Sequence, residues 1–96
     1  MITHQTLLKK RKAILEIAHK WGAYDIRIFG SVARADAGKS SDVDFIVRFQ
    51  PDRSLLDHGG LLMDLQDLLD VKVDVISEAG MRDRFRQHVL KEAVPL

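Results

Sequence analysis

The prediction of the fold depends on the stretch "FGSVARADAGKSSDVDF", Phe29 to Phe45, which can be interpreted in two ways. One interpretation starts at Ala33, where A-x-x-x-x-G-K-S nearly matches a nucleotide-binding P-loop. The other starts at Gly30, where Gly-Ser is followed ten residues later by Asp-x-Asp. Both predict a bound nucleotide, but they differ in the residues that would hold it.

Composition limits the function classes. The chain has 96 residues, which predicts a single small domain over residues 1–96. It has no cysteine, which excludes disulfides and thiolate metal sites. The net charge is +1, so we expect no direct nucleic-acid partner. No apolar run reaches the length of a membrane span, and "MITHQTLLKKRK" lacks the apolar core of a signal peptide. We therefore expect a cytoplasmic protein without membrane contact.

Periodicity predicts an alternation of helices and strands. Segments with the alternating, β-branched pattern of strands cover residues 24–29, 43–49 and 71–76. Segments with helical spacing of apolar residues cover 3–20, part of 55–69, and a last helix carrying Phe85, Val89 and Ala93. Thr3 and Ser77 are the expected N-caps of the first and last helices, and Gly22 suits the end of the first. The expected fold is α/β (α+β), with a small three-stranded mixed sheet and helices packed on one face.

The context of Lys39 disfavours the P-loop. In a P-loop the Lys-Ser pair opens a helix, whereas Lys39-Ser40 leads through two residues into a predicted strand. The first glycine of the motif is also replaced by Ala33. A polar loop is the preferred interpretation of "AGKSS".

The Gly30 interpretation fits its surroundings better. Gly30 and Ser31 end a predicted strand, where free backbone N–H groups can face a phosphate and glycine allows close approach. Asp42 and Asp44 are two residues apart at the head of the next strand, so their side chains share a face, with Cα atoms about 6.6 Å apart. Two such carboxylates favour a shared cation, and paired hard oxygen ligands favour Mg²⁺ with substrate phosphates.

Asp74 is the third candidate ligand. It lies between Val73 and Val75 and therefore points away from the core. If its strand neighbours the strand of Asp44, three carboxylates can hold two metals for phosphoryl or nucleotidyl transfer. Each aspartate also has a structural interpretation, as a cap or an exposed strand residue, although strands are depleted in aspartate. Arg34 could reach a triphosphate or form a surface ion pair.

The chain resembles the DNA polymerase β-like nucleotidyltransferases, and within them the minimal nucleotidyltransferase (MNT) proteins. The resemblance rests on "IFGSVARADAGKSSDVDFIV", "KVDVIS" and "HVLKEAVPL", and it covers nearly the whole chain. Ala35 stands where the family often has glycine, which bears on the local turn and not on the metal site.

The resemblance implies a palm-like nucleotidyltransferase core and a metal-dependent transfer from ATP. Asp42 and Asp44 would bind both metals, and Asp74 would bind the catalytic metal and help to draw the proton from the attacking hydroxyl. Gly30 and Ser31 would hold the β- and γ-phosphates, so these five residues, with Arg34, form the expected site.

The resemblance also implies a partner. MNT proteins are similar to antitoxins that transfer AMP to a tyrosine hydroxyl of a HEPN-domain ribonuclease toxin. Since one small domain leaves no room for an acceptor-binding domain, an acceptor with its own surface is expected. Two alternatives remain: an antitoxin that acts by binding alone, and a subunit of a small-molecule, aminoglycoside-type nucleotidyltransferase.

Overall fold

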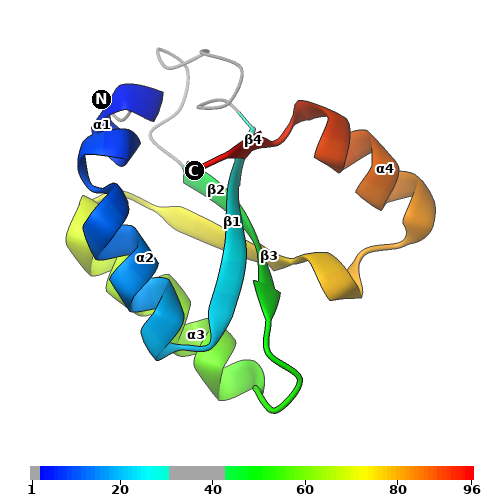
Figure 1. Ribbon diagram of the computed structural model, residues 1–96, viewed down its shortest axis with the longest axis horizontal. Helices are drawn as coiled ribbons and strands as arrows, with labels where there is room; N and C mark the ends of the chain where they lie inside the picture. The colour runs from blue at the N-terminus through cyan, green and yellow to red at the C-terminus, as the bar shows by residue number, and fades with distance from the viewer. Residues whose placement is uncertain (1–2, 31–42) are drawn as a thin grey trace.

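The structure, a computed structural model, describes residues 3–30 and 43–96 and contains one sheet flanked by helices (Figure 1). Its elements in chain order are α1 (His4–Lys9), α2 (Arg11–Lys20), β1 (Ala23–Phe29), β2 (Val43–Phe49), α3 (Leu55–Leu69), β3 (Val73–Ser77), the short 3₁₀ helix η1 (Glu78–Gly80), α4 (Asp83–Glu92) and β4 (Val94–Pro95). The predicted bounds of β2 are confirmed, and α3 fills the whole range 55–69 within which a helix was predicted. β1 begins one residue earlier than predicted, β3 begins two residues later and ends one residue later, and α4 ends at Glu92, before Ala93.

Within the described residues the sheet has four strands in the order β3-β2-β1-β4, so the prediction of three strands was wrong. β2 pairs antiparallel with β1 and parallel with β3, which confirms the prediction of a mixed sheet. The missed strand, β4, has two residues and pairs antiparallel with β1 at Arg27 and Ile28. It was missed because one of its two residues is proline, which occurs in sheets almost only at edges.

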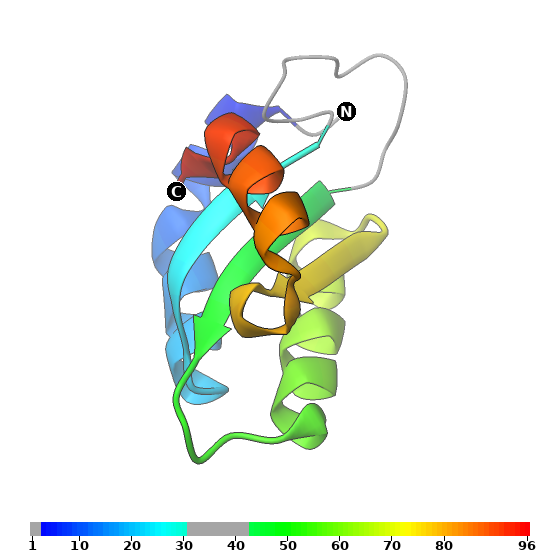
Figure 2. The same cartoon turned by 90° about the vertical axis from the view of Figure 1, so that its right-hand side faces the viewer.

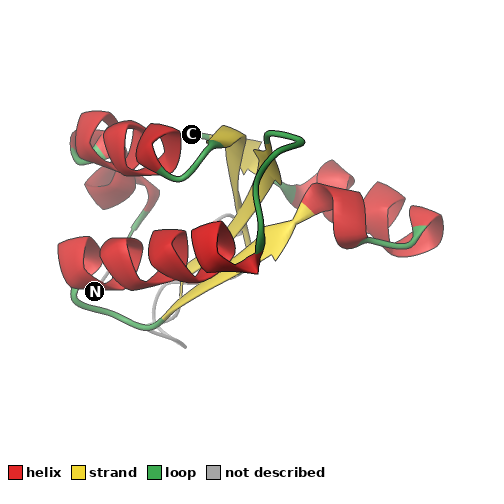
Figure 3. Cartoon of the chain, turned by 90° about the horizontal axis from the view of Figure 1, so that it is seen from below, coloured by secondary structure: helices red, strands yellow, loops and turns green. Residues whose placement is uncertain are grey.

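Helices lie on both sides of the sheet, which corrects the prediction that they cover one face. Helices α2 and α3 pack side by side on one face, and α4 lies on the opposite side (Figures 2 and 3). Ile46 and Val89 are fully buried but lie outside the main core, on the side of α4. The last helix therefore covers part of the second face.

The main core fills the space between the sheet and helices α2 and α3. Its fully buried members are Leu7, Ile14, Ile28, Val43, Phe45, Val47, Leu61, Leu65 and Val73. Along β2, residues 43, 45 and 47 face this core, so Asp44, Ile46 and Arg48 face the other side of the sheet. That second face carries the polar residues considered below.

Helix ends follow the predicted caps in part. The Thr3 hydroxyl accepts a hydrogen bond from the Thr6 amide, and Gly22 has the positive φ of 75° expected just after a helix. The predicted first helix is divided at Lys10 into α1 and α2. The prediction that Ser77 caps the last helix was wrong: η1 intervenes, and α4 has Arg82 at its N-cap.

Trp21 joins the end of α2 to α3. Its indole N–H donates to the Asp64 carboxylate at 2.8 Å, and this hydrogen bond lowers the pKa of Asp64. A Cβ atom on Gly60 would overlap the indole ring, whereas one on Gly59 would meet open space. The glycine at position 60 therefore lets the two helices approach. In the described part of the chain, no helix is long and apolar enough to cross a membrane.

Candidate active site

The turn after β1 brings Gly30 against β2. Gly30 is buried and has a φ of 81°, in the left-handed region that favours glycine. A Cβ atom at this position would overlap the Asp44 carboxylate. The absence of a side chain at residue 30 therefore allows the carboxylate to lie directly against the backbone of the turn.

Asp44 and Asp74 are side by side on parallel strands. They are register partners in the β2–β3 ladder, and Asp44 is also opposite Phe29 at the end of β1. Neighbouring strands are about 4.8 Å apart, and both side chains project from the face opposite the main core. Asp44 is partly buried and Asp74 is exposed. The predicted adjacency of their strands is confirmed, with the two residues directly opposite each other in the register.

Three predicted site residues, Ser31, Arg34 and Asp42, lie outside the described residues, as does Lys39. The described part still bears on the P-loop, because β2 begins at Val43, three positions after Ser40. Two intervening residues cannot form the helix that a P-loop lysine and serine open. The observed start of β2 therefore disfavours the P-loop, and the Gly30-based site stays a prediction.

Comparison with known proteins agrees with this geometry. The model of the family described as "Nucleotidyltransferase domain" matches residues 10–96 of the chain. The chain belongs to this nucleotidyltransferase domain family. The recognition made from the sequence motifs is therefore confirmed.

Relatives of this nucleotidyltransferase domain are named for protein modification. MJ0435 of Methanocaldococcus jannaschii, assigned as a protein adenylyltransferase, is 38% identical over 85 residues, which are 88% of this chain and 90% of that protein. Protein adenylyltransferase MntA of Thermococcus cleftensis is 34% identical over 79 residues, which are 82% of this chain and 80% of that protein.

Solved structures share the fold. One described as a minimal nucleotidyltransferase is 45% identical and superposes with a TM-score of 0.87, covering 99% of this chain and 97% of that chain. An MNT antitoxin in complex with the tri-AMPylated HEPN toxin of Shewanella oneidensis superposes with a TM-score of 0.68 at 18% identity, covering 92% and 69% of the two chains. The latter likeness shows the fold alone.

The donor set of the nucleotidyltransferase domain fits a hard divalent cation. Asp44 and Asp74 supply carboxylate oxygens from adjacent strands, and Gly30 leaves space for one of them beside the turn. Among residues 3–30 and 43–96, no group of three metal-ligating side chains is assembled. The expected third carboxylate, Asp42, directly precedes β2 and lies outside those residues.

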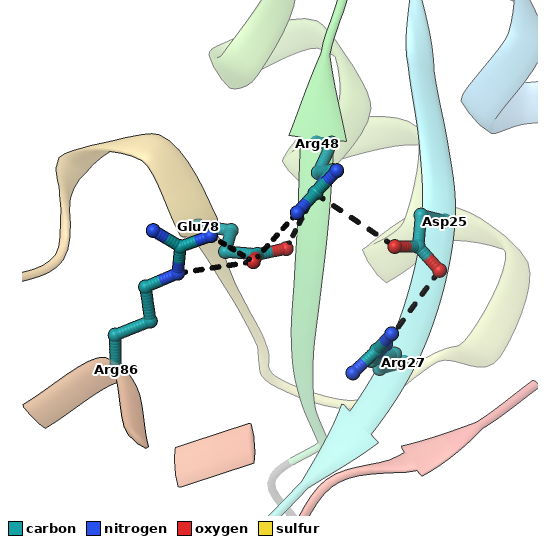
Figure 4. Close-up of polar contacts among 5 residues, drawn as sticks. All are labelled: Asp25, Arg27, Arg48, Glu78 and Arg86. Carbon is teal, nitrogen blue, oxygen red and sulfur yellow. Dashed lines mark hydrogen bonds and ion pairs between the residues drawn. The ribbon is translucent and has the colours of Figure 1, made fainter. Parts of the chain in front are cut away.

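A charged network farther along the same face was not predicted from the sequence. Glu78 is 4% exposed, and its carboxylate accepts from Arg48 Nε at 2.7 Å and from Arg86 Nε at 3.2 Å (Figure 4). Asp25 extends the network, with oxygens 3.8 Å from Arg48 Nε and 3.5 Å from Arg27 Nε. Its members belong to β1, β2, η1 and α4, so the network ties the last helix to the sheet.

The ion pair between Arg48 and Glu78 shifts the pKa of both side chains. The hydrogen bond from Arg48 lowers the pKa of Glu78, more than burial raises it. The same bond raises the pKa of Arg48 above the ordinary arginine value. No short-range signal in the sequence could have found this group, because Glu78 and Arg48 are 30 residues apart.

Proposed function

We propose that this nucleotidyltransferase domain transfers AMP from ATP to a tyrosine hydroxyl of a HEPN-domain toxin and thereby silences the toxin. The observation that carries the proposal is the register of Asp44 with Asp74 beside Gly30. The names of the relatives support protein adenylylation as the reaction. The shared fold of toxin–antitoxin complexes, one of them with AMP-PNP, supports the partner and the nucleotide.

A few residues form the proposed site, and each has a separate role. Asp42 and Asp44 would hold Mg²⁺ together with ATP, and Asp74 would join them from the neighbouring strand. Gly30 and Ser31 hold the β- and γ-phosphates through backbone N–H groups and a hydroxyl, with Arg34 as a further phosphate contact. The bound cation would polarise the transferred phosphate and balance the charge of the leaving group.

The transfer is a single displacement. The tyrosine oxygen forms a bond to the α-phosphorus while the bond from that phosphorus to the bridging oxygen breaks. The electron pair of the broken bond leaves with pyrophosphate. The Asp74 carboxylate draws the proton from the attacking hydroxyl, which makes the oxygen a better nucleophile as the bond forms. In-line positioning of the two oxygens is the main contribution expected of the binding residues.

The test is co-expression with a HEPN-domain toxin, the proposed acceptor, followed by intact-mass measurement of that protein. The wild-type chain should add AMP to it. Asp74→Asn should keep ATP affinity and complex formation but lower the transfer rate by orders of magnitude, because it removes an interaction made in the transition state. Asp67→Asn, an exposed aspartate on α3, is the matched control and should transfer at the wild-type rate.

Growth of cells carrying the toxin separates catalysis from contact. With Asp74→Asn, cells should grow poorly although the complex forms, and the toxin should carry no AMP. Protection equal to wild type in that variant would mean that neutralisation works by binding alone. Transfer of AMP to a small molecule and not to the toxin would assign the chain to the small-molecule nucleotidyltransferases instead.

A further inference from the structure

A hollow with mainly apolar walls lies beside the part of β3 that follows Asp74. This β3–α4 groove has a volume of about 510 Å³, and its walls include His58 of α3, Ile76 of β3, Met81 and Arg82 just before α4, and Phe85 in the first turn of α4. Phe85 is 51% exposed although it is a large apolar residue. Contiguous exposed apolar surface of this kind marks interaction sites in soluble proteins.

The free edge of β3 beside the groove is closed to strand addition. His58 Nε2 lies 2.7 Å from the Val75 carbonyl oxygen, and the Val73 amide donates to the side-chain oxygen of Gln66 at 3.2 Å. Side chains of α3 therefore occupy backbone groups that an added strand would need. A partner at this surface would instead insert side chains into the groove, as an amphipathic segment does.

The positive charge around the groove favours a partner segment with acidic side chains. Arg82 and Arg84 are exposed and have no ion-pair partner among the described residues, whereas Arg86 is engaged by Glu78. A second hollow of about 500 Å³, formed with Arg84 and His88, lies against Phe85 and Arg82 as well. Phe85 is thus an apolar ridge between two hollows with cationic rims, which complements an acidic segment with a bulky apolar side chain.

The position of the groove connects it to the candidate active site. Ile76, in the wall of the groove, follows Asp74 by two residues, so both side chains lie on the same face of β3 about 6.6 Å apart along the strand. A protein that docks in the groove is thereby held beside the carboxylate pair. A docking surface so close to the site can raise the local concentration of the acceptor hydroxyl.

We propose that the β3–α4 groove docks the acceptor protein of the transfer reaction through an acidic amphipathic segment whose apolar side chain packs against Phe85. This inference rests on the proposed function for the identity of the acceptor. It adds the surface that recognises that protein and the chemistry of the segment that binds.

The experiment measures three quantities for purified variants: affinity for the HEPN-domain acceptor protein, affinity for ATP with Mg²⁺, and AMP transfer by intact mass. Phe85→Ala and Arg84→Glu should each weaken affinity for the HEPN protein about ten-fold or more, as truncation of an interface hot spot does. Their ATP affinity should be unchanged. Transfer should fall at low acceptor concentration and recover when the acceptor is saturating.

Two control variants match these changes elsewhere on the surface. Leu56→Ala removes an apolar side chain that is 83% exposed, and Lys12→Glu reverses an exposed charge on α2. Both should bind the HEPN protein within about two-fold of wild type, since exposed side chains outside an interface contribute little. Binding by the wild type should also weaken with added salt, and Arg84→Glu should reduce that dependence.

Unchanged affinity for the HEPN protein in both groove variants would overturn the docking proposal, even if wild-type transfer is observed. Lost ATP affinity with intact HEPN binding would overturn it as well, because the groove would then receive the nucleotide base. A wild-type chain that binds the HEPN protein through the groove but adds no AMP would sustain the docking surface and refute the proposed reaction. A wild-type chain that does not bind the HEPN protein would refute both.

Discussion

Replacing Gly30 with alanine tests the close approach between the turn after β1 and the Asp44 carboxylate. Gly30 and Gly22 have φ angles of 81° and 75°, a conformation that costs an L-residue about 1–2 kcal/mol. The smaller entropy of the unfolded alanine chain offsets part of this cost, which leaves about 1 kcal/mol. A loss of that size lowers the melting temperature of a domain of this length by about 4–8 °C. We expect this decrease in both Gly30→Ala and Gly22→Ala.

The two variants should differ in their response to ligand. The new methyl group at residue 30 overlaps the position of the Asp44 carboxylate, whereas the one at residue 22 meets only the flexible side chain of Arg53. A ligand that binds only the native state at a hundred times its Kd adds about 2.7 kcal/mol. That corresponds to a rise of about 10–20 °C in melting temperature. Gly22→Ala should keep this rise, and Gly30→Ala should lose most of it.

The assay is thermal unfolding with and without Mg²⁺ and a non-hydrolysable ATP analogue, with ligand affinity measured by titration calorimetry. Far-ultraviolet circular dichroism checks that both variants are folded at the starting temperature. If Gly30→Ala retains the full ligand-dependent rise, the Asp44 carboxylate does not need its position beside the turn. The structural argument for a site at Gly30 would then be wrong.

Three further changes test the packing, the charged network and the discarded P-loop. Glu78→Gln should lower the free energy of unfolding at neutral pH. The pKa of Glu78 is lower in the folded protein than in the unfolded chain, so the difference in unfolding free energy between variant and wild type should vanish as the pH falls through the folded pKa. Unfolding measured at a series of acidic pH values checks this. Gly60→Ala should lower the free energy of unfolding in urea by about 1–3 kcal/mol because its methyl group overlaps Trp21, whereas Gly59→Ala should raise it by about 0.5–1 kcal/mol. Equal effects of the two changes would contradict the close contact between Gly60 and Trp21. Lys39→Ala should transfer AMP within a few-fold of wild type by intact mass, and a collapse of ATP binding would restore the P-loop.

Local sequence signals predicted the elements that contain the candidate site. The alternation of Val43, Phe45 and Val47 is a strong strand pattern, and the structure confirms the bounds of β2. The same reasoning placed Asp74 away from the core, and the register places it directly opposite Asp44 on the neighbouring strand. These predictions succeeded because side-chain direction in a strand depends only on position parity.

Features that depend on contacts distant in sequence were missed. The pairing of Val94 and Pro95 with β1 joins the last residues to a strand about seventy positions earlier, without a propensity signal of its own. Serine is a favoured N-cap residue, which is why Ser77 was predicted to cap the last helix. The residue that follows it, Glu78, is buried and forms ion pairs with arginines of β2 and α4. Tertiary ion pairing therefore overrode the local capping preference, and α4 begins six residues after Ser77.

Because β2 and β3 pair in parallel, the candidate metal site can form only in the folded chain. Asp44 and Asp74 are separated by the whole of α3 in sequence, so they meet only when the crossover from β2 through α3 to β3 has closed. In the unfolded chain the two carboxylates are independent, which means that any free energy of cation binding is also free energy of folding for this crossover. Under the proposed function, a chain without the cation would lack the transfer activity and would also be easier to unfold, and so more readily degraded.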